Sequence, residues 1–129
     1  MRTLHTTQTK FEFRFGYSRA VRHGNVIRVA GTAGLDANGQ VVPGGAGEQA
    51  RRALQIIEAA LKELGASFKD VIMTRVYVKD VADMEEIAVI HGDVFREIRP
   101  ATTIVQVGFI LPDILVEIEM EALVEEARA

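Results

Sequence analysis

A strict alternation of side chains near the C-terminus is the feature that most constrains the fold of this chain. From Val116 to Ala122 every second residue is apolar, and the three residues between them are Glu117, Glu119 and Glu121. Because successive side chains of a strand point to opposite faces, this period of two predicts a strand with one buried face and one acidic face. Three carboxylates on one face repel each other unless water or cations meet them. The strand therefore belongs in a sheet whose acidic face is solvated or paired with arginines.

Two longer segments have the spacing of amphipathic helices. Apolar residues recur three and four positions apart over residues 46–64, and Gly65 follows as a C-terminal cap. A second helix is predicted from a cap at Asp83 to about Ile98, with His91 on its apolar side, and Pro100 stops it. Each helix is expected to bury one side against the sheet.

The other β-prone runs complete the order β-β-α-β-α-β-β. The predicted strands cover residues 17–22, 26–32, 71–78, 102–109 and 114–124. In the strand at 71–78, Ile72 is expected on the same face as Thr74, Val76 and Val78. This order predicts an α+β fold with a mixed sheet and both helices on one face. The other face of the sheet needs cover, and packing against further copies of the chain is one interpretation.

The composition is that of an ordinary globular protein. With 129 residues, 48% hydrophobic and 26% charged, the chain suits one domain over 1–129, in which residues 1–15 are an N-terminal extension or edge segment. A net charge of -3 gives no reason to expect nucleic acid as a partner. The absence of cysteine excludes disulfides and thiolate chemistry. No segment resembles a signal peptide or membrane span, so a cytoplasmic protein without membrane contact is expected.

Several blocks of the sequence resemble the Rid family (YjgF-type reactive intermediate deaminases, also labelled endoribonuclease L-PSP). They are Gly-Tyr-Ser-Arg-Ala-Val at 16–21, Ala-Gly-Thr at 30–32, Val-Tyr-Val-Lys-Asp at 76–80, Pro-Ala-x-Thr at 100–103, Leu-Pro-Asp at 111–113 and Val-Glu-Ile-Glu at 116–119. The resemblance covers residues 16–124. It implies a chorismate-mutase-like domain in a homotrimer with a central barrel, and small-molecule clefts between subunits. It further implies hydrolysis of imines or enamines without a cofactor.

The resemblance also assigns candidate site residues. Glu117 matches the glutamate that handles the attacking water, Tyr17 matches a tyrosine that lines the cleft, and Gly31 lies where backbone approaches the ligand. Glu117 and Tyr17 each have a structural alternative, because a strand carboxylate and a strand tyrosine are commonly solvated. Ala30 stands where active deaminases of the family often have serine. The site is therefore expected to be more apolar than in the archetypal members.

Thr102 is the main departure from the family pattern. The archetypal members have arginine there, and a guanidinium grips a carboxylate with two hydrogen bonds, whereas a threonine hydroxyl offers one weaker contact. Losing a charged contact costs about 1.5 to 3 kcal/mol. Four arginines are candidate substitutes, although for Arg28 and Arg75 we expect structural pairing with Glu117 or Glu119. The four are Arg19, Arg28, Arg75 and Arg99.

These observations leave two classes of function open. One is a small-molecule hydrolase of the Rid type, acting on imines or enamines other than the usual ones derived from amino acids. The alternative is a non-catalytic trimer that binds a metabolite or a protein partner. A ribonuclease is disfavoured by the acidic balance and the lack of a basic aromatic groove. No spacing of metal ligands occurs, so no metal site is predicted.

Overall fold

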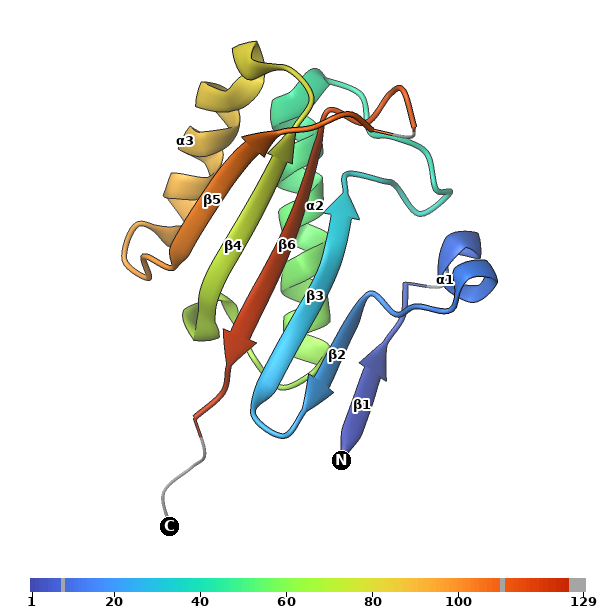
Figure 1. The fold of residues 1–129 in the computed structure, drawn as a ribbon, viewed down its shortest axis with the longest axis vertical. Helices are drawn as coiled ribbons and strands as arrows, with labels where there is room; N and C mark the ends of the chain where they lie inside the picture. Colours follow the sequence, from blue (N-terminus) through green and yellow to red (C-terminus); the bar gives the residue numbers. More distant parts are fainter. Residues whose placement is uncertain (8, 110, 126–129) are drawn as a thin grey trace.

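A mixed sheet of six strands, in the order β1-β2-β3-β6-β4-β5, is the frame of the molecule (Figure 1). The computed structural model describes residues 1–7, 9–109 and 111–125. The rest of the domain predicted over 1–129 lies outside the described residues. The strands are β1 (Arg2–His5), β2 (Ala20–His23), β3 (Val26–Ala33), β4 (Val71–Val78), β5 (Ala101–Gln106) and β6 (Val116–Leu123). The helices are α1 (Lys10–Phe15), α2 (Gly45–Glu63) and α3 (Met84–Phe95), with short 3-10 turns at Phe68–Asp70 and Val81–Asp83.

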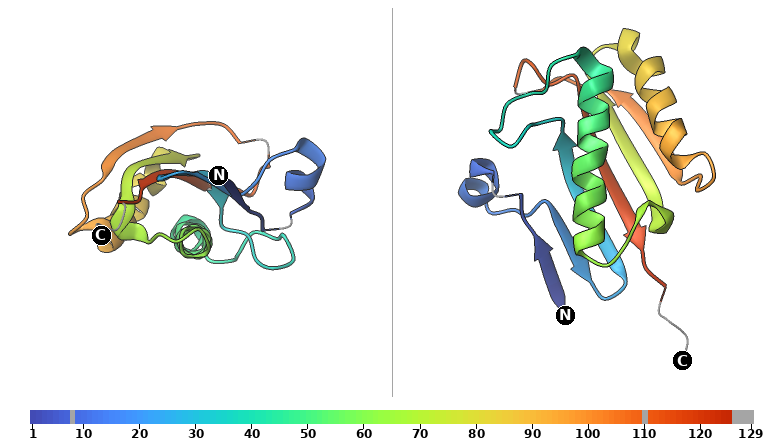
Figure 2. Two further views of the ribbon diagram at one scale, coloured as in Figure 1. Left: turned by 90° about the horizontal axis from the view of Figure 1, so that it is seen from below. Right: turned by 180° about the vertical axis from the view of Figure 1, so that it is seen from behind.

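Helices α2 and α3 cover the same face of the sheet (Figure 2). The core lies between these layers, and its largest fully buried apolar side chains are Ile27, Ile57, Leu61, Val76, Val78, Ile87, Val116, Ile118 and Met120. Fully burying an apolar side chain of this size contributes roughly 1.5 to 3 kcal/mol. The predicted α+β fold with both helices on one face is confirmed. The parallel pairing of β4 with β5 across α3 makes the sheet mixed.

Strand β6 lies in the middle of the sheet, antiparallel to β3 and β4. As predicted, its apolar residues are buried toward the helices. The acidic face meets arginines: Arg75 Nη1 lies 3.7 Å from a Glu119 carboxylate oxygen and 3.4 Å from one of Glu121, while Arg28 Nε lies 3.7 Å from Glu121. The predicted pairing with Glu119 is confirmed for Arg75. Arg28 pairs with Glu121 instead of the predicted Glu117 or Glu119, because the register of β3 against β6 places Arg28 opposite Glu121.

The expectation for Ile72 is wrong. The register of β4 against β6 shifts between Val71 and Met73, so that Ile72 is an extra residue of β4 and is 51% exposed. A bulge of this kind leaves one residue unpaired and reverses the alternation before it. Val71 therefore takes the buried position that the alternation assigned to Ile72.

The N-terminal residues add two elements to the predicted order. Strand β1 pairs antiparallel with β2 and lies at one edge of the sheet, and α1 follows it (Figure 1). Helix α1 lies beside the ends of β2 and β3 rather than over the core. This position brings the N-terminal segment to the candidate site.

Candidate functional site

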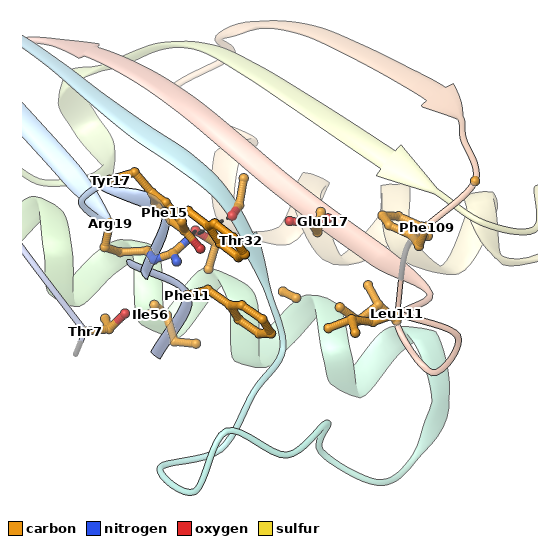
Figure 3. A pocket seen from close by; sticks show the side chains of 14 residues that line it. Thr7, Phe11, Phe15, Tyr17, Arg19, Thr32, Ile56, Phe109, Leu111 and Glu117 are labelled. Carbon is orange, nitrogen blue, oxygen red and sulfur yellow. Dashed lines mark hydrogen bonds between the residues drawn. The ribbon is translucent and has the colours of Figure 1, made fainter. Parts of the chain in front are cut away.

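A cleft of about 570 Å³ opens between the N-terminal segment and the connection from β5 to β6. Aromatic residues of the N-terminal segment make one wall, and Phe109 and Leu111 make the opposite wall (Figure 3). Glu117 of β6 lies between them. The described lining residues are Thr7, Phe11, Phe15, Tyr17, Arg19, Gly31, Thr32, Ala33, Ile56, Gly108, Phe109, Leu111, Ile114 and Glu117.

Helix α1 holds its wall in place through a capping box. The Thr9 side chain accepts a hydrogen bond from the Glu12 backbone N–H, and the Glu12 side chain accepts one from the Thr9 backbone N–H. This reciprocal pairing satisfies two backbone donors at the start of a helix. The rings of Phe11 and Phe15 then stack one turn apart, with their centroids 6.1 Å from each other. Both rings face the cleft as a result.

The Glu12 carboxylate is buried beneath this segment, with only 3% of the residue exposed. Burial alone would raise its pKa, but the hydroxyls of Thr7, Thr6 and Thr9 and the backbone N–H of Thr7 donate to the carboxylate and lower that pKa to about 2. The ionised form of a carboxyl is favoured by such donors. Glu12 is therefore a fixed negative charge behind the cleft.

Arg19 connects this charge to the sheet. Its Nη1 donates to the backbone oxygen of Gly31 at 2.7 Å and to Thr32 Oγ1 at 3.3 Å, and its Nη2 lies 3.6 Å from a Glu12 carboxylate oxygen. The guanidinium carbon lies 5.7 Å from the centre of the Tyr17 ring. Arg19 is only 7% exposed, so these contacts replace most of its hydration. Tyr17 remains 42% exposed at the mouth of the cleft.

Glu117 is the only carboxyl among the described lining residues. Burial has the largest effect on the pKa of Glu117 and raises it. Arg19 lowers this pKa and Glu119 raises it, each by less than burial does. Gly31 faces this carboxyl closely, because a Cβ placed on Gly31 would lie 3.1 Å from Glu117 Oε1. A half-buried carboxyl of raised pKa exchanges protons nearer neutral pH than an ordinary glutamate.

Thr102 does not line this cleft in a single chain. It lies on β5, at the opposite edge of the sheet from β1, beside Thr74 of β4. The two hydroxyl oxygens are 2.8 Å apart, Thr74 Oγ1 is 2.9 Å from His91 Nε2, and the Thr102 hydroxyl donates to the backbone oxygen of Pro100 at 3.1 Å. One chain therefore brings together Tyr17, Gly31 and Glu117, but not Thr102.

The remaining candidate residues lie elsewhere. Arg99 has a positive φ of 57° at the turn into β5. Glu119 accepts a short hydrogen bond from the Tyr77 hydroxyl, which raises the pKa of Tyr77. His91 is half-buried against Thr74, and burial lowers its pKa. Of the four candidate arginines, only Arg19 is among the described residues that line the cleft.

The interpretation of the sequence missed the contribution of the N-terminal segment. Phe11, Phe15 and Glu12 were expected only in an extension or edge segment, and Arg19 was one of four possible cations. The spacing Thr9-x-x-Glu12 is a capping-box signal that marks the start of a helix. It could have identified α1, but not the cleft beside it.

Within the described part of the chain, no group of three or more histidine, cysteine, aspartate or glutamate side chains could hold a metal ion. No described helix is long and apolar enough to cross a membrane.

The mixed sheet with two helices on one face, and a cleft at its edge with one carboxyl, define a YjgF-like α+β domain. The sequence profile of the Endoribonuclease L-PSP family matches residues 7–124, and the chain belongs to this Rid/YjgF family. The predicted membership is confirmed.

Solved and characterised relatives agree with this assignment. The crystal structure of Rv2704 from Mycobacterium tuberculosis, a member of the YjgF/YER057c/UK114 family, superposes with a TM-score of 0.88 at 42% identity, covering 96% of this chain and 100% of the other. The 3-aminoacrylate deaminase RutC of Acinetobacter baylyi is 39% identical over 79% of this chain and 82% of its own. A 2-iminobutanoate/2-iminopropanoate deaminase of Mus musculus is 36% identical over 83% of this chain and 80% of its own.

Proposed function

We propose that this chain is a hydrolytic deaminase of small imines or enamines, and that Glu117 handles the attacking water. The observation that carries the proposal is the half-buried Glu117 carboxyl, of raised pKa, in an otherwise largely apolar cleft. Such a carboxyl is suited to proton exchange with water or a leaving amine. Membership in a family with relatives named as enamine and imine deaminases supports the same reaction.

The chemistry needs only water and a proton carrier. The water oxygen forms a bond to the carbon of the C=N group, while Glu117 takes a proton from the water and passes it to the nitrogen. A proton then moves from the hydroxyl of the resulting carbinolamine to its nitrogen, the C–N bond breaks, ammonia leaves and the carbon becomes a carbonyl. An enamine first accepts a proton on carbon, which gives an iminium cation, and loss of a proton from its nitrogen gives the imine. No oxidant, reductant or cofactor enters this balance, so positioning and proton transfer suffice.

The other proposed site residues bind substrate rather than react with it. Tyr17 and Gly31 shape the cleft beside Glu117. In the proposed homotrimer the clefts lie between subunits, and the edge strand β5 of a neighbouring copy would present Thr102 to the substrate. Because Thr102 lacks a guanidinium, we propose substrates other than the usual amino-acid-derived imines, in a cytoplasmic setting without nucleic acid or membrane partners.

The test compares Glu117→Gln with Glu121→Gln, a matched change on the same strand face that does not line the cleft. Imines are generated from a panel of amines and amino acids by the appropriate oxidases, and hydrolysis is followed as the loss of semicarbazone formed by added semicarbazide. We expect the wild type and Glu121→Gln to accelerate hydrolysis, and Glu117→Gln to lose about a hundredfold or more. Both proteins must keep the far-UV circular dichroism of the wild type. Ligand binding without turnover by the wild type would instead support the non-catalytic alternative.

A further inference from the structure

The charges around the cleft are balanced within the protein itself. Arg19 is the only cationic side chain among the described lining residues. It is paired with Glu12, whose pKa of about 2 keeps that carboxylate ionised at any working pH. A buried charge that already has a partner gains little from a second one, because the first has replaced its hydration.

Part of the hydrogen-bonding capacity of Arg19 is also committed. Both contacts of Nη1 go to β3, to the backbone oxygen of Gly31 and to Thr32 Oγ1, and Nη2 faces Glu12. A ligand carboxylate needs two parallel donors from one guanidinium to be gripped firmly. Taking an Nη1 donor from Arg19 would break its hydrogen bond to the Gly31 oxygen or to Thr32 Oγ1, which is costly for buried groups, and a carboxylate at Nη2 would meet the like charge of Glu12.

Glu117 determines the remaining net charge of the cleft. With Arg19 and Glu12 cancelling, the charge near the cleft is that of Glu117 alone, which is zero when protonated and negative when ionised. In neither state does the described site offer an excess positive charge. When Glu117 is ionised, a ligand anion would meet a like charge in an environment of low dielectric, where like charges repel strongly.

The walls specify the rest of the ligand. Phe11 and Phe15 on one side, and Phe109 and Leu111 on the other, present apolar surface (Figure 3). Ring contacts and burial of apolar area favour an aromatic or branched aliphatic substituent. The imine nitrogen would lie toward Glu117, the polar group between these walls (Figure 3).

We infer that the cleft selects imines and enamines that carry an apolar or aromatic substituent and no carboxylate, taken as neutral molecules or as iminium cations. This inference rests on the proposed deaminase function and names its substrate class. It separates this chain from the two deaminase relatives described above, whose named substrates, 3-aminoacrylate and the 2-iminoalkanoates, are carboxylates. Arg19 is then a positioning residue for Glu12, Gly31 and Glu117, not a ligand for substrate.

Binding of stable probes tests the charge preference independently of turnover. Phenethylamine, 2-phenylethanol and 3-phenylpropanoate share one aromatic side chain and differ in charge, and their affinities can be ranked by ligand-observed NMR titration of the wild-type protein. We expect the cation and the neutral alcohol to bind at least about tenfold more tightly than the anion. Equal or tighter binding of 3-phenylpropanoate would overturn the inference, whether the cation came from Arg19 or from a neighbouring copy.

Turnover is tested with a matched pair of imines. An amine oxidase converts phenethylamine to an imine without a carboxylate, and an amino-acid oxidase converts phenylalanine to the corresponding imino acid. We expect the protein to accelerate hydrolysis of the first at least about tenfold more than that of the second. Equal or faster turnover of the imino acid would overturn the inference while leaving the proposed function intact. If neither imine is hydrolysed faster but the probes bind in the expected order, the deaminase function is wrong and the charge preference stands.

Two variants test the reason for the preference. Glu12→Gln removes the partner of Arg19, so 3-phenylpropanoate should gain about tenfold or more in affinity relative to 2-phenylethanol. If this variant does not fold, the double variant Glu12→Gln/Arg19→Gln replaces it, because it removes both members of the neutral pair: affinity for the anion should stay within about twofold of the wild type. A fall of tenfold or more in the double variant would show that Arg19 does hold the anion, and would overturn the inference.

Discussion

The carboxylate of Glu12 is expected to be a major stabilising group of the N-terminal segment. Its pKa falls from an ordinary value of 4.5 to about 2 in the folded chain. Each tenfold change in proton affinity corresponds to about 1.4 kcal/mol, so the ionised carboxylate contributes about 3 kcal/mol to the free energy of unfolding. Glu12→Gln should remove about this amount from the free energy of unfolding at pH 7. The substitution also leaves the buried Arg19 without its counter-charge.

The sign of the pH dependence follows from the lowered pKa. The stabilisation is present above the unfolded-state pKa near 4.5 and is lost as the pH falls through the folded-state value near 2. At pH 3 the carboxyl is mostly protonated in the unfolded chain and mostly ionised in the folded one. The difference in unfolding free energy between wild type and Glu12→Gln should therefore shrink by about 2 kcal/mol between pH 7 and pH 3.

Urea unfolding followed by circular dichroism, at one protein concentration and several pH values, measures this difference. Glu58→Gln is the matched control, because Glu58 pairs with Lys62 at 3.7 Å on the exposed side of α2. Such a pair contributes about 0.5 kcal/mol or less. The reasoning is refuted if Glu12→Gln changes the unfolding free energy at pH 7 no more than Glu58→Gln does. It is equally refuted if the gap between wild type and Glu12→Gln is the same at both pH values.

Three further predictions concern the cleft and the sheet beside it. Gly31→Ala would place a methyl group 3.1 Å from Glu117 Oε1, so kcat/KM should fall about ten- to a hundredfold with little change in the urea midpoint; full activity would contradict the proposed role of that carboxyl. Gly34→Ala would place a methyl group 2.4 Å from the backbone oxygen of Gln49, which should lower the unfolding free energy by about 1 to 3 kcal/mol. An unchanged midpoint would contradict this close packing of α2 against Gly34, the residue that follows β3. Burial raises the pKa of Glu117, so the acid limb of the pH–rate profile should lie above the range of an ordinary glutamate. Arg19 lowers the same pKa, so the acid limb should move to still higher pH in Arg19→Gln. An acid limb that does not move would contradict the electrostatic effect of Arg19 on Glu117.

Most of the fold could be predicted because local periodicity reports which side of an element is buried. The predicted and observed limits of β4 coincide at residues 71–78, and those of α2 differ by one residue at each end. Strand β5 ends three residues earlier than predicted, at Gln106. The exception inside a strand is Ile72, since a bulge depends on the register against β6 and leaves no mark on the alternation of β4 itself.

The candidate site was predictable only in part. Family resemblance indicated Glu117, Tyr17 and Gly31, and one chain places all three around a single cleft. The partners of Arg19 could not be predicted, because Glu12 and Gly31 belong to different segments that meet only when α1 packs beside β3. The role of Thr102 stays a prediction, since it depends on how copies of the chain associate.

The sequence by itself determined the order of strands and helices from β2 to β6, the acidic and apolar faces of β6 and the family. These properties depend on residue type and short-range spacing, which the chain carries whatever its neighbours are. Only the tertiary structure decided which arginine meets which glutamate: Arg75 and Arg28 pair with the acidic face of β6, whereas Arg19 pairs with Glu12 beside the cleft. Electrostatic contacts depend on distances of a few ångströms between residues far apart in the chain, and those distances arise from sheet register and packing.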